Sequence, residues 1–148
     1  NKKIKKGNKL DIKKIIVASA GPLTNLIIII ITYNLKIDMI KAIMVIYTNF
    51  LIMIFNLLPI YPLDGGRILS GILHIIVGKQ KADDAINNIS MISTILITAI
   101  ASVLILYLKN IAIFLIVMYL WYLVLKESNR YLRRKKYIMK ILENKTNK

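Results

Sequence analysis

Long uncharged apolar runs are the feature that most constrains how this chain of 148 residues can fold. They occupy residues 15–35, 42–63, 85–108 and 110–125, and Lys, Arg or Asp lies close to each of them. A helix of about 20 apolar residues spans a bilayer core, so the first three runs are long enough to cross it. The fourth is shorter, but Trp121 and its neighbouring tyrosines suit the membrane interface. The sequence therefore predicts an all-α membrane protein with about four transmembrane helices.

The expected organisation is a basic arm at 1–14, a transmembrane domain at 15–125 and a basic amphipathic tail at 127–148. The predicted spans are 15–35, 40–63 with a continuation to 78, 87–108 and 110–126. A straight helix from 42 to 78 would be about 55 Å long, which exceeds the thickness of a bilayer core. We therefore expect a break within the segment NLLPIYPLDGGR, where helix-breaking residues gather: Asn56, Pro59, Pro62, Gly65 and Gly66.

The net charge of +15 is concentrated at the two ends of the chain. Residues 1–14 contain seven Lys and one Asp, and residues 126–148 contain nine Lys and Arg and two Glu. Because basic segments remain in the cytoplasm, both ends are expected there, which requires an even number of spans. We expect the tail to bind anionic membrane lipids. Nucleic-acid binding is not expected, since the charge is divided between distant ends.

Asp64 is the acidic residue that the sequence places at membrane depth, in the cytoplasmic half. A carboxylate there is costly and usually pairs with a cation, a metal or a proton path. One interpretation is ordinary turn chemistry, in which Asp64 caps the next helix and Arg67 is its partner. The other is a metal ligand or proton carrier held by irregular backbone. The residues alone leave both open.

A second motif, ASAGPLTN at residues 18–25, combines small residues with Asn25. Small residues favour close helix packing, and Asn25 is placed to hydrogen-bond exposed backbone at the break, although plain packing is the alternative. The single histidine, His74, would lie about 15 Å from Asp64 along a helix, so we expect a packing or interfacial role for it. With no cysteine, a metal must use His, Asp or Glu.

AGPLTN opening one span and NLLPIYPLDGG ending the next resemble the site-2 protease family of intramembrane zinc metalloproteases, peptidase family M50. The resemblance covers about residues 10–78 and is closest to the stage IV sporulation subgroup of spore-forming bacteria. It implies that Asp64 is a zinc ligand. It also implies structural roles around the site for Asn56, Pro59, Pro62, Gly65, Gly66, Gly21, Pro22 and Asn25.

In that family the other zinc ligands and the catalytic Glu come from a His-Glu-x-x-His helix upstream, which this sequence lacks. No catalytic residue is therefore expected in this chain, which we expect to be inactive alone. The start at Asn1 favours a truncated C-terminal part. The implied activity is cleavage of a membrane-associated protein near the cytoplasmic face of a bacterial cell membrane. A sporulation transcription-factor precursor is the implied substrate, and a regulatory membrane subunit is a further partner.

Two other classes remain open. A degenerate or split relative would act as a membrane interaction protein, and Asp64→Asn would not change its behaviour. A transporter subunit would use Asp64 as a proton or cation site, but the sequence shows no inverted repeat.

Overall fold

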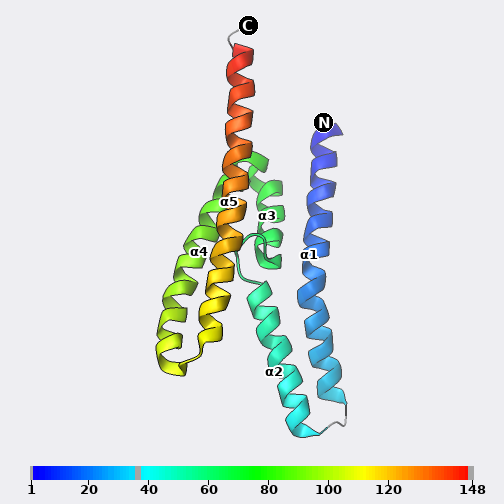
Figure 1. The fold of residues 1–148 in the computed structure, drawn as a ribbon. Coiled ribbons are helices and arrows are strands. Elements are labelled where there is room, and N and C mark those ends of the chain that lie inside the picture. Colours follow the sequence, from blue (N-terminus) through cyan, green and yellow to red (C-terminus); the bar gives the residue numbers. More distant parts are fainter. Residues whose placement is uncertain (1, 36–37, 147–148) are drawn as a thin grey trace. The chain divides into compact units, whose positions relative to one another are not determined.

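The computed structural model describes residues 2–35 and 38–146, and helices account for almost all of them. The elements are α1 (Lys2–Asn34), α2 (Met39–Asn56), α3 (Asp64–Val77), α4 (Lys79–Leu108) and α5 (Ile111–Thr146) (Figure 1). No strand occurs within the described ranges. The all-α prediction is confirmed.

Among the residues that the structure describes, four helices are long and apolar enough to cross a membrane. The candidate spans are Lys9–Asn34, Met39–Asn56, Lys79–Leu108 and Ile111–Ile141. α2 has no buried residue, so its apolar surface is suited to lipid rather than to water. α3 has 14 residues and is too short to span on its own. The fold is that of a multi-pass helical membrane protein, and the expected number of spans is confirmed.

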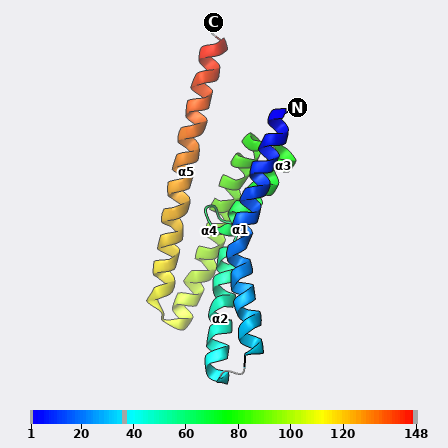
Figure 2. The ribbon, with the colours of Figure 1, turned by 90° about the vertical axis from the view of Figure 1, so that its right-hand side faces the viewer.

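The chain divides into two compact units, Asn1–Ile86 and Asn87–Lys148, with the boundary inside α4. In the first unit α1 packs against both α2 and α3 (Figures 1 and 2). α1 and α2 form an antiparallel hairpin, and the Asp38 side chain caps α2 by accepting a hydrogen bond from the Ile40 amide at 3.4 Å. α2 ends at Asn56 and α3 begins at Asp64, so the predicted break lies at residues 57–63.

In the second unit the rest of α4 pairs with α5 in an antiparallel hairpin. Lys109 turns the chain with a positive φ of 50°, and the Asn110 side chain accepts a hydrogen bond from the Ala112 amide at 2.9 Å. Between the helices, the Trp121 indole N–H donates to the Thr98 hydroxyl at 2.9 Å. α5 continues without a break through residues 126–127, so the basic tail is the end of the same helix as the apolar segment.

Candidate functional site around the helix break

The break between α2 and α3 is a compact turn rather than a loose loop. The Leu57 amide completes α2 by donating to the Met53 carbonyl at 3.0 Å. Within the turn, the Ile60 amide donates to the Leu58 carbonyl and the Leu63 amide to the Ile60 carbonyl, both at 2.7 Å. The Ile60 side chain is fully buried. These contacts fix the chain immediately before Asp64.

Two prolines explain why the helix does not continue through this turn. Pro59 and Pro62 have no amide hydrogen to donate to a preceding carbonyl, and the ring of each hinders the turn before it. The peptide bond between Tyr61 and Pro62 is cis. The break therefore follows from local sequence.

Gly65 and Gly66 let the turn fold back against the first turn of α3. A Cβ atom at position 65 would overlap the Leu57 carbonyl group, and one at position 66 would overlap the backbone of Ile60 and Tyr61. Backbone atoms cannot move aside as a flexible side chain can. The tight turn thus requires residues without a Cβ atom at both positions.

Asp64 is the first residue of α3, and its carboxylate does not cap that helix. The N-cap residue is Leu63, and no side chain caps the helix there. The Asp64 side chain is 25% exposed, and its Oδ1 atom lies 3.8 Å from Nη1 of Arg67. Among the described residues this ion pair is its one polar contact. The arrangement contains the expected Arg67 pair but not the expected cap, and the helix N-terminus favours the negative charge.

Gly21 of α1 faces the Asp64 carboxylate. A Cβ atom at position 21 would lie 2.7 Å from Oδ2 and 3.7 Å from Cγ of Asp64. Pro22 beside it is buried inside α1, and Asn25, one turn further on, is half-buried. In the described part of the chain, the Asn25 side chain makes no hydrogen bond to the break. The two sequence motifs therefore meet at Gly21 and Asp64.

Asp64 alone does not make a metal site. The structure, in the part of the chain that it describes, contains no group of three or more His, Cys, Asp or Glu side chains that could hold a metal ion. A catalytic zinc takes three protein ligands and an open position. The described residues therefore offer one carboxylate ligand and do not fit a complete zinc site.

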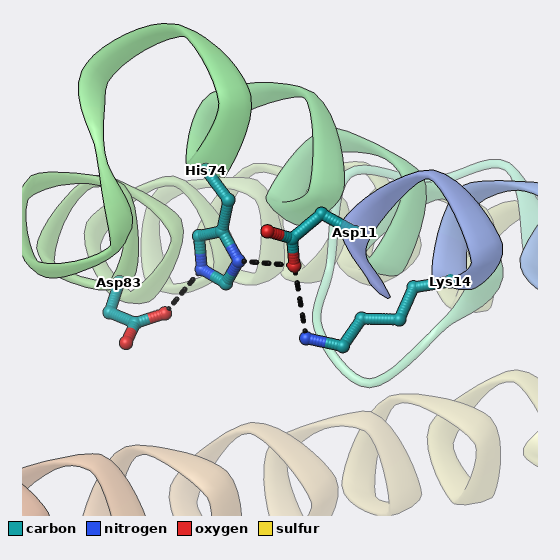
Figure 3. A network of polar contacts seen from close by, with 4 residues as sticks. All are labelled: Asp11, Lys14, His74 and Asp83. Carbon is teal, nitrogen blue, oxygen red and sulfur yellow. Dashed lines mark hydrogen bonds and ion pairs between the residues drawn. The ribbon is translucent and has the colours of Figure 1, made fainter. Parts of the chain in front are cut away.

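A second polar cluster joins α1, α3 and the start of α4, and it was not anticipated from the sequence (Figure 3). His74 of α3 contacts Asp11 of α1 and Asp83 of α4, and Lys14 joins the cluster through Asp11. The expected packing role of His74 agrees with its side chain being only 6% exposed. Its two acidic partners were missed. One signal was available, because Asp11 is the one acid among the seven lysines of the arm.

One family model matches a segment of the chain that contains the helix break. Residues 33–100 match the model described as peptidase family M50. The matched segment includes α2, the break with Asp64 and all of α3, but not Gly21. No curated protein and no solved structure gave a significant match to the chain. Over this segment, which is less than half of the chain, the sequence is similar to peptidase family M50.

Proposed function

We propose that this chain is the C-terminal part of an intramembrane zinc metalloendopeptidase, in which Asp64 is one zinc ligand. The position of Asp64 carries the proposal. Asp64 is the first residue of α3, directly after the break that follows α2, and its carboxylate contacts Gly21 of α1. Among the described residues, the 3.8 Å ion pair between its Oδ1 atom and Arg67 is the one polar contact of this carboxylate. The M50 match over residues 33–100 supports the same assignment.

The remaining ligands and the general base are proposed to come from a His-Glu-x-x-His helix upstream of this sequence. When bound, zinc would polarise the scissile carbonyl and activate a water molecule. The chain itself contributes the carboxylate and the compact turn at 57–63. We expect a substrate segment to lie beside this turn in an unwound form, because a peptide bond within a helix is shielded and already hydrogen-bonded.

The proposed setting is a bacterial cell membrane with both basic ends of the segment in the cytoplasm. The seven lysines in residues 1–14 and the nine Lys and Arg in residues 126–148 support this orientation. The proposed substrate is a membrane-associated protein cut near the cytoplasmic face, with a sporulation transcription-factor precursor as the narrower suggestion. A regulatory membrane subunit and anionic lipids along the basic end of α5 are the proposed partners.

The test uses the native polypeptide isolated from its own membranes. Its intact mass and N-terminal sequence are determined together with its zinc content, and the zinc measurement is repeated for Asp64→Asn. Asp38→Asn is the matched control, because Asn retains the capping oxygen of α2 away from the break. We expect about one zinc per chain, lost in Asp64→Asn and kept in Asp38→Asn. A native chain without zinc, or one whose zinc survives Asp64→Asn, would reject the proposal.

The second candidate is a membrane interaction protein, a catalytically inactive or split relative of the same enzymes. One observation favours it, since the described residues bring a single carboxylate rather than a ligand group to the break. It predicts a native polypeptide with no zinc-binding helix and with partner binding that is unchanged in Asp64→Asn. The mass and zinc measurements therefore separate the two candidates.

A further inference from the structure

The buried side chain of His74 connects three helices of the first unit. Its Nδ1 atom is 3.2 Å from Oδ1 of Asp11 on α1, and its Nε2 atom is 2.8 Å from Oδ1 of Asp83 on α4 (Figure 3). Lys14 lies 3.2 Å from the same oxygen of Asp11 but belongs to α1 itself. The contacts of His74 thus hold different helices together, whereas the contact of Lys14 does not.

The chemistry of this cluster favours a firm connection. A carboxylate only accepts hydrogen bonds, and a neutral imidazole has one N–H to donate. Both contacts are hydrogen bonds when the ring carries two protons, and such charge-assisted bonds are stronger than neutral ones. Between membrane helices, interhelical hydrogen bonds and close packing replace the hydrophobic driving force.

The cluster lies on the same seam between α1 and α3 as Asp64. A Cβ atom at Gly71, one turn before His74, would be 2.6 Å from Cγ1 of Ile15. Asp11, Ile15 and Gly21 therefore meet α3 in the order His74, Gly71 and Asp64. The two helices run antiparallel along one line of contact, with His74 at one end and Asp64 at the other.

We propose that His74 is a positioning residue that fixes the register of α3 against α1 through Asp11 and thereby holds Asp64 against Gly21. α3 needs such a contact because it is short and lies between the turn at 57–63 and Gly78, which has a positive φ of 84°. A slip of one helical turn would move Asp64 by about 5.4 Å. The role of Asp64 as a metal ligand rests on the proposed function, but its position beside Gly21 does not.

The absence of cysteine in this sequence allows a direct test of that position. In the double variant Gly21→Cys and Asp64→Cys, the sulfur at position 64 would replace a Cγ atom that lies 3.7 Å from the Cβ position of residue 21. This separation is within reach of a disulfide after a small adjustment. The rate of disulfide formation under a mild oxidant is followed in the full chain in membranes, with free thiols counted by mass after alkylation.

We expect His74→Ala and Asp11→Asn each to slow this cross-link by about fivefold or more. The control Lys14→Ala should change the rate by less than about twofold, because it removes a contact within α1 only. Circular dichroism checks that each variant keeps its helical content. An unchanged rate in both His74→Ala and Asp11→Asn overturns the proposal.

A rescue experiment separates this connection from simple packing by the imidazole. The swap Asp11→His with His74→Asp, together with Asp83→Asn to avoid two facing carboxylates, reverses the pair between α1 and α3. We expect the swap to restore the cross-linking rate to within about twofold of the parent. A rate as slow as that of His74→Ala would overturn the assignment to the Asp11 contact. Neither experiment requires zinc or cleavage, so failure here is distinct from failure of the proposed function.

Discussion

The Asp64 carboxylate lies so close to Gly21 that a Cβ atom at position 21 would be 2.7 Å from its Oδ2 atom. Gly21 lies inside α1, where glycine is about 0.5–1 kcal/mol less favourable than alanine. The contact with Asp64 explains why a residue that weakens the helix is useful there. Space for the carboxylate, rather than helix stability, accounts for this glycine.

Gly21→Ala should therefore separate stability from function. The added methyl group would displace the end of the Asp64 side chain, while the helix would gain up to about 1 kcal/mol. We expect unchanged or slightly greater resistance to unfolding in SDS. On the proposed function, the zinc affinity of the native polypeptide should fall at least about tenfold. The neighbouring exposed residue supplies the control Ala20→Ser, which adds one atom away from Asp64 and should leave zinc binding unchanged. Full zinc binding by Gly21→Ala would contradict this role of the glycine.

Gly66→Ala should destabilise the fold itself. Its Cβ atom would overlap the backbone of Ile60 and Tyr61, which cannot rotate away, so the turn would have to move. We expect a loss of about 2–3 kcal/mol in the free energy of unfolding, measured by SDS titration with circular dichroism. Gly21→Ala is the comparison, because its Cβ atom meets a flexible side chain instead. Equal stability of the two variants would argue against a tight turn at 57–63.

Arg67→Gln distinguishes the two interpretations of Asp64. The Asp64–Arg67 pair is 3.8 Å long and its arginine side chain is 43% exposed, so its loss should cost less than about 1 kcal/mol. On the proposed function, the native polypeptide carrying Arg67→Gln should keep its zinc affinity to within about threefold, whereas Asp64→Asn should lose the metal. Zinc content by mass spectrometry of the purified variants is the measurement. If both variants lost zinc equally, the ion pair rather than the free carboxylate would be the important feature.

Local patterns in the sequence were sufficient to predict the helical class, the number of spans and the break. Each depends on neighbouring residues, such as the prolines at 59 and 62. The helix ends were less predictable. α4 begins at Lys79 and α5 continues to Thr146, so both helices extend through charged segments. Neither helix contains a proline or glycine that would stop it. Charged residues in the sequence therefore indicate where the apolar span ends, but they do not indicate where the helix ends.

The spacing of residues along the sequence was not sufficient to predict the contacts between helices. Gly21 and Asp64 belong to recognisable motifs, yet only packing of α1 on α3 brings them together. The Asp11–His74 contact joins residues 63 positions apart, and no local pattern marks such a pair. The number of residues between His74 and Asp64 correctly predicts that the two lie at opposite ends of one helix. It does not predict which residues of other helices contact them.

Trp121 and Thr98 offer a test of the second unit that is independent of the candidate site. The Thr98 hydroxyl donates to the Thr94 carbonyl at 2.7 Å, which leaves its oxygen free to accept the Trp121 indole N–H at 2.9 Å. A double-mutant cycle of Trp121→Phe and Thr98→Val should give a coupling energy of about 0.6 kcal/mol, within the range for hydrogen bonds between membrane helices. SDS unfolding of the four proteins supplies the energies.

The control for this cycle replaces Trp121→Phe with Tyr122→Phe, which changes an exposed side chain next to it. The Tyr122 hydroxyl contacts Lys126 of the same helix and not Thr98, so its coupling with Thr98→Val should be near zero. Additive effects of Trp121→Phe and Thr98→Val would mean that the indole contributes through packing area alone. A clear coupling would instead identify this hydrogen bond as a specific link between α4 and α5.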